Sequence, residues 1–455
     1  MRLYNTLTRK QNDFQPADDT VKMYVCGPNL YAPCHVGHAM SYVIFDVLRR
    51  YLEYRGYKVR HVQNFTDIED KIIARAESLG VTIDQLAERY TEQFFDDMDA
   101  LNVQRAHVYP RATEEIPGMI EMIQGLIARG YAYEIDGDVY FRVTRDEDYG
   151  ELSGRSLEDL QAGARIEVDE RKEHPMDFAL WKASKAGEPA WDSPWGPGRP
   201  GWHIECSVMS RKYLGETLDI HGGGQDLIFP HHENEKAQSE SYAGKKPFVR
   251  FWVHNGLVRL SESEEKMTRS LGNLVPIADA VAEHGSDTLR LFILTSHYRN
   301  PLTYADEALN AARKGVERLR IAARTPSPDG AGDDIDAAPY RQRFIEAMDD
   351  DLNTAQALAA LFALAREINR ARDEGRPVAQ AQATLLELAG VLGLRLEEEE
   401  GAIAAAPFIE LLIEVRNDLR EAQQWALADK IRSRLSDLGI ALEDTREGTV
   451  WRRKK

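Results

Sequence analysis

Residues 21–63, VKMYVCGPNLYAPCHVGHAMSYVIFDVLRRYLEYRGYKVRHVQ, contain the pattern that decides the fold class. The run VKMYV at residues 21–25 predicts a short strand, and a Gly-Pro-Asn turn follows it. Over residues 38–54 apolar side chains recur at helical spacing, and residues 58–63 predict the next strand. A strand, a helix and a strand in succession are typical of a parallel α/β sheet with right-handed crossovers.

The sheet pattern is interrupted after the first hundred residues and then resumes. Residues 106–200 have a looser pattern, and residues 187–202 are rich in Gly, Pro and Trp without a helical or strand period. Strand patterns return at residues 215–219 and 249–258. We therefore expect one parallel sheet in two halves, with residues 106–200 inserted between them.

The remainder of the chain predicts helices. A Pro/Gly/Asp-rich linker at residues 325–334 and an acidic run at 397–400 mark two boundaries. Beyond the second boundary we expect two helices, at residues 409–420 and 425–438, and then a small hairpin. The expected segments are the first half of the sheet domain at 1–105, the insertion at 106–200, the second half of the sheet domain at 201–290, a helical bundle at 291–396 and a small C-terminal domain at 401–455.

The composition is that of a globular protein with reduced cysteines. Of the 455 residues, 43% are hydrophobic and 29% are charged, which argues against wholesale disorder. Three cysteines are too few for a disulfide framework, and no apolar run resembles a signal peptide or a membrane span. We therefore expect a cytoplasmic protein with no membrane partner.

The charge is unevenly distributed along the chain. The net charge of −18 weighs against a nucleic acid as partner. Residues 410–455, however, carry ten basic and nine acidic side chains, which is +1 and leaves −19 for the remainder. The chain ends with Trp451 and four cations, a pattern that suits stacking on an unpaired base and contact with phosphate. The alternative is a solvated end whose Trp451 packs against its own hairpin.

Two short motifs suit the handling of phosphate. His35, Gly37 and His38 lie between the first strand and the first helix, so that two imidazoles and a helix N-terminus can face an anion. Lys266 and Arg269, in KMTRS, follow a late strand within a Ser/Glu-rich loop and suit a departing polyphosphate. Histidines beside a glycine also occur by chance, and a solvated, charge-mixed loop is the alternative for the second motif.

A soft metal site is the third candidate. His231 and Glu235 are spaced i, i+4 and share a face if this segment is helical, while Cys26 ends the first strand and Cys206 lies in WHIEC. Two thiolates, an imidazole and a carboxylate are a ligand set that zinc accepts. Cys34 is the other candidate, but Cys26 lies at the carboxyl end of a strand, where α/β folds place their sites. Buried structural cysteines are the alternative to a metal site.

A run of glycines gives a weaker signal. His221, Gly222, Gly223 and Gly224 follow an expected strand at residues 218–220. Consecutive glycines let a ligand rest against bare backbone, but without a GKS or GxGxxG pattern this is neither a P-loop nor a dinucleotide site. A flexible loop is the alternative.

Together these motifs resemble those of class I aminoacyl-tRNA synthetases, and in particular those of the cysteine-specific family. HVGH resembles the HIGH motif of that class and KMTRS its KMSKS motif, in the same order and with an insertion between them. The more specific matches span nearly the whole chain: MYVCGPNLY at residue 23, NFTDIEDK at 64, PMDFALWK at 175, GRPGWHIECS at 198, DIHGGGQDLIFPHHENE at 219, RSLGN at 269, AMDDDLNT at 347 and GTVWRRKK at 448.

The resemblance implies a Rossmann-like catalytic domain split by an insertion and followed by helical domains. It implies a monomeric ligase that joins L-cysteine to tRNA(Cys) with ATP and Mg²⁺ and has no separate editing domain. One zinc ion per chain would bind the substrate thiol. The implied zinc ligands are Cys26, Cys206, His231 and Glu235. The implied ATP-binding residues are His35, Gly37, His38, Lys266 and Arg269, all catalytic except the glycine. The implied cysteine-pocket residues are Thr66, Trp202, His221 and Asp226.

Two departures concern the second motif. Thr268 stands where that class has Ser and keeps the hydroxyl, whereas Arg269 replaces the second Lys and changes the shape and hydration of the cation.

Two rival functions fit parts of the pattern. A ligase that joins cysteine to an amino sugar in mycothiol synthesis resembles the catalytic half, but should lack the segment at residues 410–455. A non-catalytic descendant that binds zinc and RNA is disfavoured by the intact HVGH and KMTRS motifs. Cysteine-dependent ATP–pyrophosphate exchange separates the enzymes from the binding protein, and the acceptor separates the two enzymes.

Overall fold

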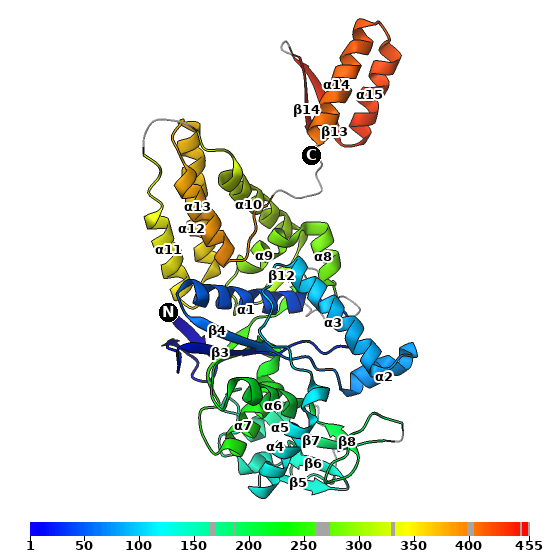
Figure 1. Cartoon of the computed structure of the whole chain (residues 1–455), viewed down its shortest axis with the longest axis vertical. Helices are drawn as coiled ribbons and strands as arrows, with labels where there is room; N and C mark the ends of the chain where they lie inside the picture. Colours follow the sequence, from blue (N-terminus) through cyan, green and yellow to red (C-terminus); the bar gives the residue numbers. More distant parts are fainter. Residues whose placement is uncertain are drawn as a thin grey trace. The chain divides into compact units, whose positions relative to one another are not determined.

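The computed structural model describes residues 1–163, 170–185, 187–260, 274–328, 333–397, 405–445 and 448–453. The chain forms two compact units, Met1–Leu396 and Glu397–Lys455 (Figure 1). Each unit has its own hydrophobic core and is described separately.

A parallel sheet of four strands is the centre of the first unit. Its strand order is β10-β9-β3-β4, and every neighbouring pair is parallel. Segments from both sides of the insertion therefore meet in one sheet, which confirms the expected Rossmann-like fold class. The strands are β3 (Thr20–Val25), β4 (Lys58–Gln63), β9 (Leu218–Gly224) and β10 (Val249–Asn255).

The two faces of this sheet enter different cores. Met23 and Val25 pack with helix α1 (Val36–Tyr54), whereas Tyr24 packs with helix α6 (Trp202–Leu214). The alternation follows from the period of two of a strand, and Figure 1 shows the two helices on opposite faces. Each fully buried aliphatic or aromatic side chain contributes about 1.5–3 kcal/mol. The first strand–helix–strand unit thus lies where its sequence pattern predicts.

The glycine run belongs to strand β9, which is longer than the expected strand at residues 218–220 and excludes the alternative of a flexible loop. A Cβ atom on Gly222 would lie 2.1 Å from the ring of Phe45 on α1, so the helix packs against bare backbone there. The carbonyl of Gly222 also accepts a hydrogen bond from the amide of Cys26, at 3.2 Å. The absent side chains therefore permit close packing in a central strand.

The insertion forms a second sheet with its own helices. The antiparallel strand order is β5-β6-β7-β8, and the last strand lies within residues 187–202, where the sequence showed no period. The bounds are η1 (Ala112–Glu115), α4 (Ile116–Ala128), β5 (Ala132–Ile135), β6 (Asp138–Phe141), η2 (Val143–Arg145), α5 (Leu157–Gly163), β7 (Phe178–Ala183) and β8 (Gly198–Pro200).

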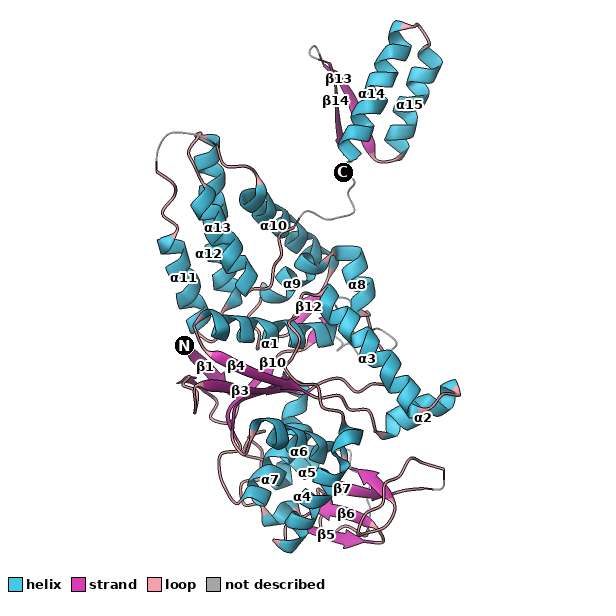
Figure 2. Ribbon diagram, in the orientation of Figure 1, coloured by secondary structure: helices cyan, strands magenta, loops and turns pink. Residues whose placement is uncertain are grey.

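Helices complete the first unit, as Figure 2 shows. The buried ion pair between Arg290 Nη2 and Asp46 Oδ2, at 2.6 Å, joins α9 to α1. The remaining elements are β1 (Arg2–Asn5), β2 (Lys10–Asp13), α2 (Asp70–Leu79), α3 (Ile83–Ala100), η3 (Gln225–Leu227), η4 (Ile228–His232), α7 (Glu233–Ala243), β11 (Val258–Leu260), α8 (Ile277–His284), α9 (Ser286–Leu294), β12 (Leu302–Tyr304), α10 (Asp306–Arg324), α11 (Ala338–Asp349), α12 (Thr354–Asp373) and α13 (Ala379–Val391).

The second unit is small. It contains α14 (Ala405–Glu421), α15 (Trp425–Asp437) and an antiparallel hairpin of β13 (Ile440–Thr445) and β14 (Gly448–Arg453). These are the two helices and the hairpin that the sequence predicts. The buried core consists of Ile409, Ile413, Leu435 and Leu442, and Trp451 is half-buried against it.

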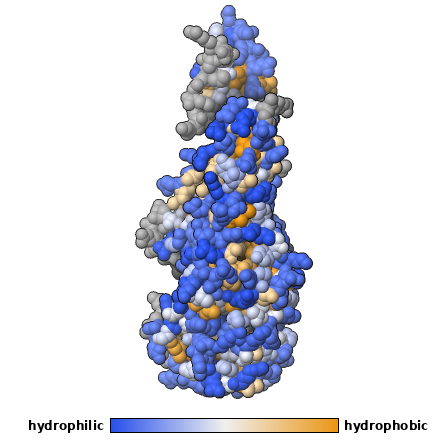
Figure 3. Space-filling model, turned by 90° about the vertical axis from the view of Figure 1, so that its left-hand side faces the viewer, coloured by the Kyte–Doolittle hydropathy of each residue, from blue (hydrophilic) through white to orange (hydrophobic). Residues whose placement is uncertain are grey.

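The face shown in Figure 3 is mostly hydrophilic, with small separate hydrophobic patches. Among the described residues, every helix is too short or too polar to cross a lipid bilayer.

Candidate functional site

A pocket of about 490 Å³ lies beyond the carboxyl ends of the parallel strands and beside the N-terminus of α1. Open α/β sheets place ligands at this edge. Cys26, Thr66, Trp202 and Asp226 line the pocket together with the turn that begins α1. Residues that are up to 200 positions apart in the sequence therefore surround one space.

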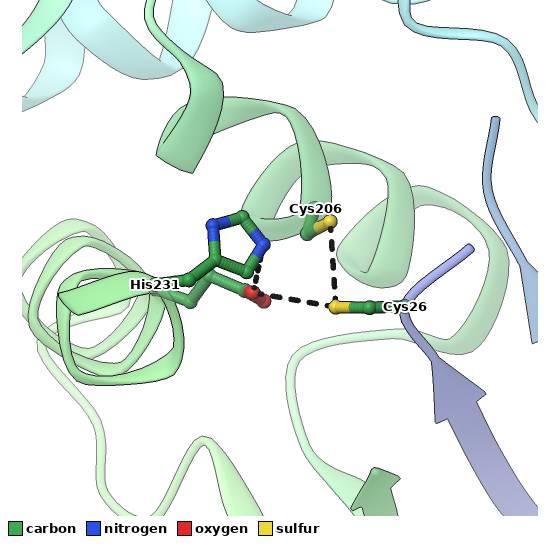
Figure 4. Close-up of side chains that lie close together, drawn as sticks. Cys26, Cys206 and His231 are labelled. Carbon is green, nitrogen blue, oxygen red and sulfur yellow. Dashed lines mark hydrogen bonds and ion pairs between the residues drawn. The ribbon is translucent and has the colours of Figure 1, made fainter. Parts of the chain in front are cut away.

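The four predicted metal ligands lie close together, and three of them, Cys26, Cys206 and His231, line one end of this pocket (Figure 4). Cys26 Sγ lies 3.9 Å from Cys206 Sγ and 3.8 Å from Glu235 Oε1. His231 Nε2 lies 2.9 Å from Glu235 Oε1, because the backbone is helical at His232 and Glu233, where η4 meets α7, and the two residues are i, i+4. Cys34, the alternative ligand, is instead buried in the core around α1.

The cluster is charged in a way that suits a cation. Burial alone would raise the pKa of Glu235, but His221 and His231 outweigh it and lower that pKa to about 2. Burial would lower the pKa of His231, yet Glu235 and Cys206 raise it to about 10. At Cys206 the hydrogen bond with Cys26 and the proximity of His231 outweigh burial and lower the pKa to about 6. Burial, Cys206 and Glu235 instead raise the pKa of the Cys26 thiol, so a soft dication would take the place of the protons on Cys26 and His231.

Two overlapping donor sets could hold a metal ion, and both contain Cys26 and Glu235. The other members are Cys206 and His231 in the first set, and His221 and His232 in the second. Cys206 and His231 line the pocket, whereas His221 and His232 are absent from its lining and are fully buried. Three members of the first set line the pocket but only Cys26 of the second set does, so the first set fits a catalytic metal better.

The predicted pocket residues occupy two different layers. Trp202 stacks on the ring of His231, with centroids 4.1 Å apart and an interplanar angle of 23°. Thr66 lines the pocket and donates a hydrogen bond to Glu205 Oε2, at 3.0 Å, and Asp226 lies on the pocket wall. His221 lies behind the ligands, where its Nε2 is 2.8 Å from Glu235 Oε2.

Three further histidines contact this cluster, and the sequence analysis assigned them no role. His203 Nδ1 is 3.0 Å from His231 Nδ1. His232 Nε2 is 3.3 Å from Cys26 Sγ, and His232 Nδ1 is 2.8 Å from His254 Nε2. Two sequence features could have indicated these residues. His232 is the second histidine of PHHENE, and His254 lies near the carboxyl end of the buried strand β10.

The HVGH turn forms the other end of the pocket. The His35 ring accepts a hydrogen bond from the Gly37 amide at 3.1 Å, and His38 Nδ1 accepts one from the His35 amide at 3.2 Å. The two rings stack with centroids 3.9 Å apart. A Cβ atom on Gly37 would lie 2.8 Å from the His35 ring, so glycine lets the imidazole cover the helix N-terminus. Lys266 and Arg269 lie outside the described residues.

The chain matches known families over most of its length. Residues 13–314 match the model of the tRNA synthetases class I (C) catalytic domain, and residues 343–397 match the DALR domain. The chain is 58% identical to a cysteine–tRNA ligase of Dehalococcoides mccartyi, with 100% of both chains covered. It is 50% identical to one of Geobacillus thermodenitrificans, with 100% of this chain and 99% of the relative covered.

A solved structure shares the fold. A methionyl-tRNA synthetase of Mycobacterium tuberculosis, in complex with methionyl-adenylate, superposes with a TM-score of 0.59 at 17% identity, covering 87% of this chain and 94% of that one. On the domain match and the full-length identity, the chain belongs to the cysteine–tRNA ligase family of the class I aminoacyl-tRNA synthetases.

Proposed function

We propose that the protein activates L-cysteine with ATP and transfers the cysteinyl group to the 3′ end of tRNA(Cys). In the first step the cysteine carboxylate attacks the α-phosphate of ATP and pyrophosphate leaves. In the second step a terminal ribose hydroxyl of the tRNA attacks the adenylate, and AMP leaves. One observation carries the proposal: three residues of a soft donor cluster and the HVGH turn at the start of α1 line the same pocket.

Cys26, Cys206, His231 and Glu235 would hold one zinc ion per chain. When bound, zinc would supply a soft Lewis acid that favours a thiolate over a neutral hydroxyl at neutral pH. The ligand atoms of the four residues lie within 4.8 Å of one another, which supports this assignment. Because the metal recognises sulfur, the pocket separates cysteine from serine without a separate editing domain, where shape alone separates near-isosteres poorly.

The residues around the donors orient the substrate. Trp202, stacked on His231, provides a flat wall beside the metal position. Thr66 and Asp226 provide polar groups on the pocket wall, of which the carboxylate suits the ammonium group of an amino acid. His221 orients Glu235 from behind, which fixes the carboxylate before the substrate arrives.

The HVGH turn would stabilise the charge that develops on the α-phosphoryl group. The rings of His35 and His38 and the N-terminus of α1 provide donors and a favourable dipole there. Lys266 and Arg269 would act on the departing pyrophosphate, and Mg²⁺ would accompany ATP, held mainly by the phosphates.

The C-terminal unit would serve the tRNA alone. Residues 410–455 of this unit carry a net charge of +1 in a chain of −18, and the helices and hairpin form a core that is independent of the catalytic sheet. The family of the chain supports tRNA as acceptor, in place of an amino sugar.

Parallel charging assays test the proposal. Purified protein is incubated with ATP, radiolabelled cysteine or serine, and either tRNA(Cys) transcript or the amino sugar acceptor. We expect acid-precipitable cysteine only with the tRNA and at least about 100-fold less serine. Cysteine transfer to the amino sugar, or no cysteine-dependent pyrophosphate exchange, would contradict the proposal.

A further inference from the structure

A chain of three hydrogen bonds runs from the N-terminal segment to the metal cluster. Thr6, which follows β1, has its Oγ1 2.8 Å from His254 Nδ1. His254 Nε2 lies 2.8 Å from His232 Nδ1, and His232 Nε2 lies 3.3 Å from Cys26 Sγ. Both rings are buried, whereas Thr6 is only half-buried. This series of hydrogen bonds therefore connects the proposed ligand Cys26 to Thr6, which lies 20 positions earlier in the sequence.

The direction of these hydrogen bonds follows from the inventory of donors and acceptors. With a metal ion bound, Cys26 would be a thiolate, which can only accept, so His232 Nε2 would carry the hydrogen. The other nitrogen of a neutral His232 then accepts from His254 Nε2, and His254 Nδ1 in turn accepts from the Thr6 hydroxyl. The Thr6 backbone is fixed by its amide, which donates to the Trp252 carbonyl at 2.9 Å. The Thr6 hydroxyl thus supplies the outermost donor of a series of hydrogen bonds that all point toward Cys26.

Such a donor has a chemical purpose at Cys26. The set of Cys26, Cys206 and Glu235 carries three negative charges when ionised, and a substrate thiolate adds a fourth. A hydrogen bond to the Cys26 thiolate withdraws electron density from its sulfur, which leaves the metal better able to accept one more thiolate. A neutral serine hydroxyl adds no charge and gains less from this donor.

Resting on the function proposed above, we infer that Thr6 is a positioning residue that, through His254 and His232, holds a donor on Cys26 and thereby favours cysteine over serine. The competing assignment is the second donor set, in which His232 itself is a ligand. If His232 is a ligand, replacing its side chain should remove the metal. If His232 only donates a hydrogen bond to Cys26, the metal should stay when either Thr6 or His232 is replaced.

The test compares Thr6→Val, which removes the hydroxyl at nearly constant volume, with Thr6→Ser, which keeps it. Zinc content, the cysteine KM and kcat of pyrophosphate exchange, and the sulfur-to-cobalt charge-transfer band of the cobalt-substituted proteins are measured. Outer partners of a metal site are typically worth 10- to 100-fold, and Thr6 lies further out, so we expect Thr6→Val to raise the cysteine KM about 3- to 10-fold. Zinc content and kcat should remain near those of the wild type.

The cobalt band gives a readout that a merely structural role would not change. Loss of the donor raises the energy of the sulfur lone pairs, so the band of Thr6→Val should shift to longer wavelength, while Thr6→Ser should match the wild type. His232→Leu should keep zinc and shift the band further. An unshifted band in Thr6→Val, equal effects of Val and Ser, or loss of zinc in His232→Leu would overturn the inference. The band is read without substrate, so it decides whether Thr6 maintains a donor on Cys26 even if the protein fails to activate cysteine.

Discussion

The metal pocket and the C-terminal unit are built in opposite ways. The pocket buries charged and imidazole side chains that pair with one another, and Glu235 and His232 have no exposed surface. The C-terminal unit has a core of four buried side chains, Ile409, Ile413, Leu435 and Leu442, and leaves the large apolar Phe408 and Trp425 more than half exposed, at 58% and 56%. The pocket is preorganised for a small ligand, whereas the unit presents its large side chains at the surface. We therefore expect substitutions in the pocket to affect cysteine activation, and loss of the unit to affect only the acceptor step.

The largest expected effect on cysteine-dependent exchange comes from Cys206→Ala. Removing a thiolate from the donor set should lower zinc content from one per chain to near zero, and exchange should fall by more than about 100-fold, because even outer partners of a metal are worth 10- to 100-fold. Metal analysis and exchange assays measure both quantities. The matched control is Cys34→Ala, which removes a cysteine that lies in the core around α1 and should keep its zinc. Retention of zinc in Cys206→Ala would exclude this residue from the site.

His38→Ala tests the other end of the pocket. The loss of one preorganised donor to a developing charge typically costs about 10²- to 10³-fold, so the kcat of exchange should fall in this range. Zinc content should be unchanged, because His38 lies at the start of α1 and outside the donor set. A fall of less than about fivefold would remove His38 from the proposed role.

Arg269→Ala should have a smaller effect on the same assay. A hydrogen bond between charged groups is worth about 1.5–3 kcal/mol, which corresponds to about a 10- to 150-fold slower exchange. The affinity for cysteine should change much less. Arg269→Lys, which restores the residue usual in the KMSKS motif, should recover most of the rate. An unchanged exchange rate in the alanine variant would contradict the assignment.

Deletion of residues 397–455 should have the smallest effect on exchange. The deleted segment is a compact unit of its own, so the rate should stay within about twofold of the full chain. Charging of tRNA should fall greatly, and each lost phosphate contact should flatten the salt dependence of tRNA binding by a slope of about 0.7 to 0.9. Undiminished charging by the folded truncation would show that the unit has another purpose.

The sequence predicted the elements with strong local signals. The strand–helix–strand unit needs only period-two and helical patterns, and β4 begins and ends where its pattern predicts. The four residues of the proposed donor set could also be named, because Cys26 directly follows a strand and His231 and Glu235 have helical spacing. The reason for glycine at Gly222 could not be predicted, because it is the ring of Phe45, which lies 177 positions earlier.

The supporting histidines could not be predicted, because their roles arise from tertiary contacts. His254 and Thr6 are separated by 248 positions and meet only when β1 packs beside β10. His221 was expected to line the cysteine pocket, but the register of β9 places its side chain behind Glu235. A change of one position along a strand moves a side chain to the opposite face, and sequence alone does not fix that choice here.

A zinc titration of chelator-stripped protein tests the central claim most directly. Zinc is added in steps of a fraction of an equivalent per chain, and cysteine- and serine-dependent pyrophosphate exchange are measured at each step. The account predicts no cysteine-dependent exchange in the stripped protein, a linear recovery that ends at one equivalent of zinc, and serine-dependent exchange that stays near background throughout. Full cysteine-dependent exchange by the zinc-free protein would contradict it.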